Sequence, residues 1–103
     1  MPGPATSVEA LAWIQEAVST GRYLVDPHFR KRCAQRKFTV FDAKRIIGTA
    51  SVCEPYEADR VLAGGTSWRL TGTATDGSVA KVGVEAFRDH LGKRVILITI
   101  MDS

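Results

Sequence analysis

The chain is poor in the residues that build disulfide frameworks, metal centres and nucleotide cradles. Its 103 residues include two cysteines, Cys33 and Cys53, and two histidines. Two cysteines are too few for a disulfide scaffold, and they lack the Cys-x-x-Cys spacing typical of zinc sites. The glycines of "AGGTS", residues 63–67, have neither a Walker lysine nor Rossmann spacing. We therefore expect free thiols, no metal and no cofactor.

Long apolar runs are missing too. No segment approaches the roughly 20 apolar residues that a membrane-spanning helix needs. The N-terminal "MPGPATSVEALAWIQEAV" lacks the basic and apolar regions of a secretory signal. We therefore expect no membrane partner and a cytoplasmic location. The hydrophobic content of 45% predicts one globular domain with its own core.

Positive charge is concentrated in one segment. Residues 22–45 carry eight Lys or Arg against two Asp, a local net charge of +6. The rest of the chain carries six Lys or Arg against nine Asp or Glu, a net charge of −3. Segregated charge of this kind bears on binding partners rather than on the fold, and it favours an anionic partner.

The first half of the chain predicts helices. Residues 1–6 read as a flexible leader, because they contain two prolines and a glycine and little to bury. Thr6 and Glu9 then form a capping box for a helix over about residues 7–20, and Gly21 ends it.

Two shorter helices follow. Asp26 is a suitable N-cap for the second, and Pro27 fits its first position. The third begins at Thr39, with Asp42 three residues later, and ends at Gly48. Neither helix is long enough to be stable alone, so both must pack on another element.

From residue 50 the periodicity changes to two, which predicts strands. Pro55 makes the segment 51–57 an edge strand. The segments 66–75 and 79–87 alternate apolar and polar residues on either side of an Asp76–Gly77 hairpin turn. The last segment, 94–100, is apolar on both faces, as in a central strand. The prediction is a single α+β domain over residues 7–103, with three N-terminal helices packed on an antiparallel sheet of about four strands.

The cations of the second helix fall on two sides. At about 100° per residue, His28, Arg32 and Arg36 border the apolar stripe of Phe29 and Cys33. The others face solvent: Arg30, Lys31 and Lys37.

Two interpretations of the His28–Arg32–Arg36 row are open. In the first it is structural, and its arginines pair with Asp42, Glu54 or Glu57 where the helix meets the sheet. In the second it is functional: the arginines converge on a phosphate, and His28 moves a proton.

The order of these residues carries a family resemblance. The stretch "HFRKRCAQRKFTVFDAKRIIG" has the pattern H-x-x-x-R-x-x-x-R, then an apolar residue, Thr, two residues and Asp, and then a helix that ends in Gly. With "WRLTG", the DG turn, a valine-rich strand and "VILITI", it resembles the bacterial family called domain of unknown function 4258. The resemblance covers about residues 28–100. The chain departs from it at Lys37, where such sequences often have Gly.

The resemblance implies chemistry as well as a fold. The function of that family is unassigned, but its layout is similar to that of the RelE-type ribonuclease toxins. These enzymes cleave RNA with an acid, a base and arginines, without a metal. By analogy His28 would be the acid or base, and Arg32 and Arg69 the catalytic cations. The substrate-binding residues would be Arg36, Lys37, Lys44 and Arg45.

Two functions from different classes follow. The first is a small RNA-directed, metal-independent ribonuclease or toxin-type protein, with RNA and an antitoxin-like protein as partners. The second is a non-catalytic interaction module, such as a homodimer formed through a sheet, in which the His–Arg row is structural. Three other residues stay open. Thr99 is either a satisfied core hydroxyl or a hydroxyl beside His28, and Trp13 and Trp68 are either core residues or base-stacking surfaces.

Overall fold

Each helix begins at a side chain that accepts a backbone hydrogen bond. The computed structural model describes residues 3–57 and 62–102. Helix α1, Ser7–Ser19, follows Thr6, which accepts from the N–H of Glu9 at 3.2 Å. Helix α2, Pro27–Arg36, follows Asp26, which accepts from the N–H of the second helical residue at 3.0 Å. These two predicted starts are confirmed.

Helix α3, Val40–Thr49, confirms the predicted capping box. Thr39 accepts from the N–H of Asp42 at 3.2 Å, and the Asp42 carboxylate accepts from the N–H of Thr39 at 2.9 Å. The helix continues one residue beyond Gly48, where we expected it to end.

The predicted antiparallel sheet is present and is extended by an unpredicted strand. Strand β2, Val52–Pro55, lies at one edge, as the proline predicts, and pairs with β3, Thr66–Thr73, which in turn pairs with β4, Val79–Asp89. Strand β5, Gly92–Asp102, is an interior strand between β4 and β1, and the order is β1-β5-β4-β3-β2. The added strand β1, Tyr23–Val25, pairs with β5 in parallel.

Over residues 3–57 and 62–102 the fold is therefore α+β, with three helices and a mixed sheet of five strands rather than an antiparallel sheet of about four. Strand β1 escaped prediction because three residues are too few to show alternation, and its partner lies at the far end of the chain.

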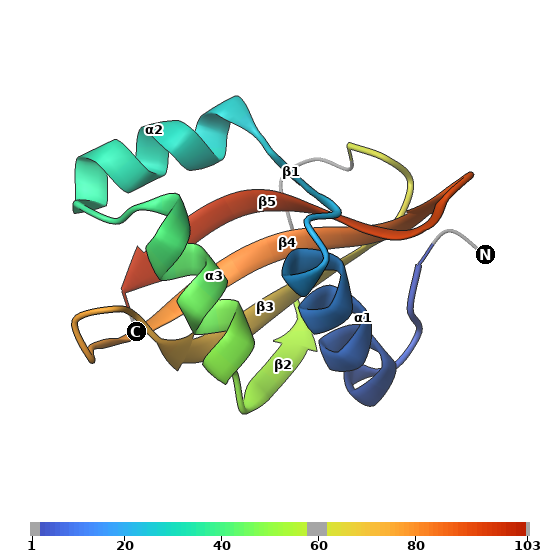
Figure 1. The fold of residues 1–103 in the computed structure, drawn as a ribbon, viewed down its shortest axis with the longest axis horizontal. Coiled ribbons are helices and arrows are strands. Elements are labelled where there is room, and N and C mark those ends of the chain that lie inside the picture. The colour runs from blue at the N-terminus through green and yellow to red at the C-terminus, as the bar shows by residue number, and fades with distance from the viewer. Residues whose placement is uncertain (1–2, 58–61, 103) are drawn as a thin grey trace.

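The helices take up different positions relative to the sheet (Figure 1). Helices α1 and α3 lie next to each other over one face, whereas α2 runs along β5 near the free part of its edge. Because β1 pairs with β5 only as far as Leu97, α2 accompanies the part of β5 that has no strand partner on that side.

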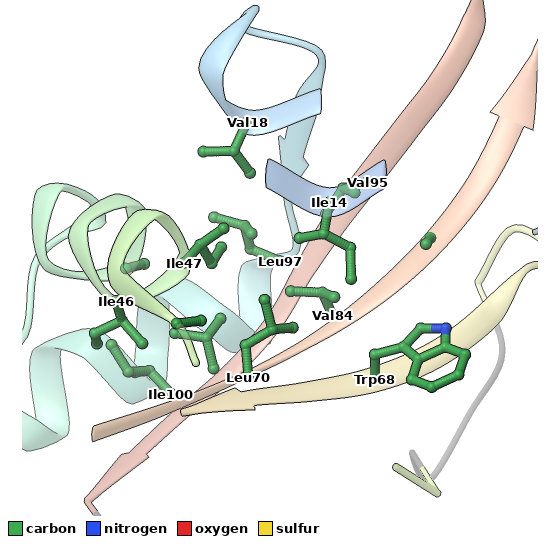
Figure 2. Packing of buried hydrophobic residues seen from close by; sticks show 14 of the residues in the cluster. Ile14, Val18, Ile46, Ile47, Trp68, Leu70, Val84, Val95, Leu97 and Ile100 are labelled. Carbon is green, nitrogen blue, oxygen red and sulfur yellow. The ribbon is translucent and has the colours of Figure 1, made fainter. Parts of the chain in front are cut away.

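The core lies between the sheet and the helices (Figure 2). Close approach of α3 to β3 depends on Gly72, since a Cβ at this position would lie 2.1 Å from the carbonyl oxygen of Ile46. Figure 2 labels ten of the buried side chains: Ile14, Val18, Ile46, Ile47, Trp68, Leu70, Val84, Val95, Leu97 and Ile100. Trp13 and Trp68 are 7% and 4% exposed, so both are core residues.

The opposite face of the sheet contains a fully buried carboxylate. Glu85 accepts hydrogen bonds from the N–H groups of Leu62, Ala63 and Gly65 at 2.7, 2.7 and 3.0 Å. Three donors satisfy a charge that would otherwise be costly to bury. Glu85 thereby ties the segment 62–65 to β4.

Part of the segment expected to be a flexible leader packs on the sheet. Gly3 and Pro4 are buried, and the carbonyl oxygen of Pro4 accepts from Thr66 Oγ1 at 2.8 Å. The chain entering α1 is therefore attached to β3. Among the described residues, no helix has the length and apolarity to cross a membrane.

The Glu85 anchor predicts a loss of stability on mutation. Glu85→Ala would leave three N–H groups without their acceptor and should lower the free energy of unfolding by about 2–3 kcal/mol, as measured by urea denaturation. Glu57→Ala is the control, because Glu57 is exposed and should change stability by less than about 0.5 kcal/mol. A loss below about 1 kcal/mol for Glu85→Ala would show that the segment 62–65 is held by other contacts.

Candidate functional site

The first turns of α2 bring two predicted catalytic residues together. His28 is exposed, and its Nε2 accepts a hydrogen bond from Arg32 Nε at 3.4 Å. The two residues are one helical turn apart, so their side chains meet on one face. This bond requires a lone pair on Nε2, which an imidazole offers in the tautomer that has its proton on Nδ1. Among the described residues, no carboxylate is bonded to either side chain.

The end of α2 presents two of the predicted substrate-binding cations. Arg36 lies 4.0 Å from Asp102, and both side chains are substantially exposed, so this ion pair is weak. Lys37 is exposed and adopts the left-handed conformation with φ 59°, which ends the helix. The family that the chain resembles often has Gly here, and the left-handed conformation gives the physical reason for that preference.

Arg36 and Lys37 also border a hollow of about 320 Å³ between the end of α2 and the β3–β4 turn. Asp42, Asp76 and Asp102 line the same hollow. With two cations and three carboxylates, this hollow is not specialised for anions.

Arg69 is separate from the His28–Arg32 pair. It lies on β3 between the buried Trp68 and Leu70, so its side chain is on the sheet face away from α1 and α3. Its Nε and Nη2 donate to Glu54 Oε1 at 2.9 and 2.6 Å. No hydrogen bond or ion pair among the described residues joins Arg69 to α2. Glu54 balances its charge, and the structure does not bring it together with the other two predicted catalytic residues.

The carboxylates proposed as structural partners for the α2 arginines are engaged elsewhere or exposed. Asp42 caps α3, and its other oxygen accepts from the N–H of Thr75 at 3.1 Å and from the Thr75 hydroxyl. Glu54 binds Arg69, and Glu57 is exposed. None of the three is bonded to Arg32 or Arg36 within the residues that the structure describes.

One of the two predicted substrate-binding cations of α3, Lys44, lies beside two aromatic rings. The Lys44 ammonium is 5.6 Å from the centre of the Tyr23 ring and 5.8 Å from that of Phe41. Arg45 is exposed. Sequence reasoning considered the tryptophans as base-stacking residues and overlooked Phe41, which is 75% exposed. The signal was its spacing of three and four residues from the two cations.

The cysteines are not nucleophiles in this fold. Both are free thiols. Burial raises the pKa of Cys33 and raises that of Cys53 to about 11, so both stay protonated near neutral pH. Residues 3–57 and 62–102 contain no group of three or more His, Cys, Asp or Glu side chains placed to hold a metal ion.

Thr99 and the second histidine of the chain, His90, lie away from His28. Thr99 pairs with Gly83, and a Cβ on that glycine would lie 2.8 Å from Thr99 Cγ2 and 2.9 Å from the Tyr56 ring. Thr99 and Tyr56 therefore both lie beside Gly83, on the sheet face away from α1 and α3. His90 is exposed in the turn between β4 and β5.

Comparisons of the chain with models of protein families, with curated proteins and with solved structures find no match. The resemblance described above thus rests on the sequence pattern, and the candidate site rests on its own geometry.

The left-handed conformation of Lys37 predicts a stabilising substitution. Lys37→Gly should raise the free energy of unfolding by about 0.5–1 kcal/mol, because a side chain costs energy at positive φ and glycine does not. The control is Lys37→Ala, which removes the charge but keeps a Cβ and should give no such gain. Equal stabilities of the two variants in urea denaturation would show that charge, rather than backbone conformation, governs this position.

The hydrogen bonds that Asp42 accepts predict that the stability of the fold depends on pH. Hydrogen bonds from Thr75, together with those from Thr39, lower the pKa of this carboxyl in the folded chain. Its stabilisation is therefore fully present above the unfolded pKa near 4 and is lost as the pH falls through the lower folded value.

Replacing Asp42 by Asn should cost about 1–2 kcal/mol at pH 7 and should flatten the fall in stability between pH 5 and pH 3. Thermal unfolding across that range tests the expectation, with Asp102→Asn as the control because Asp102 is exposed. An unchanged pH profile for Asp42→Asn would assign the acid sensitivity to other carboxyls.

Proposed function

We propose that this chain is a small RNA-binding domain that contacts the phosphate backbone through α2. One observation carries the proposal: the side chains of an exposed histidine and its arginine neighbour are bonded to each other and to no carboxylate among the described residues. A guanidinium that is left with free donors next to the protein surface is suited to phosphate oxygens. The basic segment that contains the pair has a net charge of +6 and supplies long-range attraction.

The same pair is suited to metal-independent cleavage. When Arg32 turns towards a phosphate, the Nε2 lone pair of His28 becomes available to take the proton of a ribose 2′-hydroxyl. The 2′-oxygen then attacks the phosphorus, the bond to the 5′-oxygen breaks, and a 2′,3′-cyclic phosphate forms. Arg32 stabilises the charge that develops on the phosphorane. One imidazole serves one of the two proton transfers, so in this scheme water protonates the leaving oxygen.

Arg69 is left out of this proposed site. Glu54 neutralises it, and its guanidinium lies 5.9 Å from the centre of the Tyr56 ring. The proposal therefore assigns cleavage to fewer groups than the resemblance to the RelE-type toxins implies, and slow cleavage follows from that.

A second candidate, the non-catalytic interaction module, is favoured by an apolar hollow. It has a volume of about 340 Å³ at the edge strand β1, and its lining includes Leu24, Leu62 and Ile96. Leu24 and Leu62 are 44% and 37% exposed. An edge strand beside an apolar hollow is the arrangement by which sheets pair between chains. A dimer in solution that Leu24→Asp dissociates, together with no RNA binding at low salt, would favour this module over the RNA-binding domain.

The RNA proposal is tested by one pair of histidine variants. His28→Ala should reduce RNA cleavage in the presence of EDTA by about 100-fold or more, measured by gel analysis of end-labelled RNA. His90→Ala is the matched control, because it removes the other exposed histidine and should leave cleavage unchanged. Undiminished cleavage by His28→Ala would remove the catalytic part of the proposal.

Binding is tested separately from cleavage. Affinity should fall steeply between 50 and 200 mM salt, and Arg32→Ala should reduce the slope of log affinity against log salt by about 0.7–0.9. Affinity that is independent of salt would contradict phosphate binding through α2.

A further inference from the structure

Phe41 is unusual among the aromatic residues of this chain. All eight lie in the described part of the chain, and Phe41 is the exposed member, at 75%; the other seven are buried or half-buried. Its neighbours on α3, Ala43, Ile46 and Ile47, point into the core. Phe41 therefore lies on the outer side of an amphipathic helix, where its ring contributes little to the core.

Two cations lie beside this ring. Lys44 and Arg45 follow Phe41 by three and four residues, which places all three on one helix face. The Lys44 ammonium is 5.8 Å from the centre of the Phe41 ring, within the range of a cation–π contact. Among residues 3–57 and 62–102, neither Lys44 nor Arg45 has a carboxylate partner, so both charges remain available to an anion.

An exposed apolar residue alone has no special meaning. Leu91, in the β4–β5 turn, is 68% exposed, but no cation pair stands three and four residues after it. What distinguishes Phe41 is the combination of a planar ring with uncompensated cations. A base stacked on an aromatic ring with its phosphates on adjacent Lys or Arg is the usual arrangement in proteins that bind single strands. In a duplex the faces of the bases are already stacked and are closed to such a ring.

We propose that Phe41 is a stacking surface for an unpaired base, and that Lys44 and Arg45 bind the phosphates beside that base. The substrate class of the domain is then single-stranded rather than double-stranded RNA. This inference rests on the proposed RNA-binding function and adds the strandedness of the substrate and the residue that selects it.

The test compares single-stranded and duplex RNA of one length. Fluorescence anisotropy of a labelled 12-nucleotide strand should show that Phe41→Ala weakens binding on the order of tenfold, whereas the weaker binding of the matching 12-base-pair duplex should not change. Phe41→Trp should keep the wild-type affinity, because stacking needs an aromatic ring and not Phe in particular. Leu91→Ala removes a comparably exposed apolar side chain at another place in the fold and should have no effect.

The salt dependence of binding distinguishes the contribution of the Phe41 ring from that of the cations. Phe41→Ala should lower the affinity without changing the salt slope, since it removes no charge, whereas Arg45→Ala should reduce the slope. Circular dichroism and thermal unfolding of Phe41→Ala should match the wild type, because the ring is exposed. Phe41→Trp keeps the test decisive if Phe41→Ala fails to fold: the inference then requires that Phe41→Trp bind the single strand at least as tightly as the wild type.

The outcomes distinguish this inference from the proposed function. If Phe41→Ala binds the single strand as tightly as the wild type while Arg32→Ala loses affinity, the stacking role is overturned and the RNA-binding domain stands. If the wild-type chain binds duplex as tightly as single strand, the assigned substrate class is overturned. If it binds neither RNA at 50 mM salt, both proposals fail.

Discussion

The pairing of β1 with β5 is the interaction on which the position of the basic helix depends. The N–H of Asp26, the residue after β1, donates to the carbonyl oxygen of Leu97 at 3.1 Å, and the side chain of Asp26 then caps α2. One residue thus joins the last strand of the sheet to the first turn of the helix. Phe29 and Cys33 are buried and fix the rotation of α2. His28 is exposed and Arg32 half-buried, because the opposite side of the helix packs into the core.

The distribution of charge follows from where the carboxylates are used. Glu85 holds the segment 62–65, Asp42 holds α3 and the β3–β4 turn, and Asp89 holds Arg22 and Arg94 at the end of β4. These carboxylates satisfy donors that the fold itself creates, and few remain for the cations of α2 and α3. The segregation of charge seen along the sequence therefore persists in three dimensions, on two helices that are adjacent in the chain.

Binding and chemistry place different demands on this surface. Phosphate binding needs cations with free donors, and the exposed residues of α2 and α3 supply them. Cleavage needs a proton acceptor and charge stabilisation around one phosphorus atom, and the surface offers a single imidazole with one bonded guanidinium. Under the proposed function, this balance favours a protein whose affinity for RNA exceeds its power as a catalyst. In the same proposal the Phe41 ring beside Lys44 and Arg45 would add discrimination between strands, which charge alone does not provide.

The sequence by itself determined the three helices, the four antiparallel strands and the segregation of charge along the chain. Caps such as Thr6 and Asp26, the Asp76–Gly77 turn and the period-two strands are local signals, because they depend on neighbours a few residues away. Only the tertiary structure decided that the sheet is mixed, since β1 is a strand because it pairs in parallel with β5, at the other end of the chain. The same holds for the site: His28 and Arg32 meet because they share one helix, whereas the separation of Arg69 and its bond to Glu54 depend on strand order and register. Periodicity predicts which face of its own helix or strand a residue occupies, whereas long-range packing decides which other residues that face contacts.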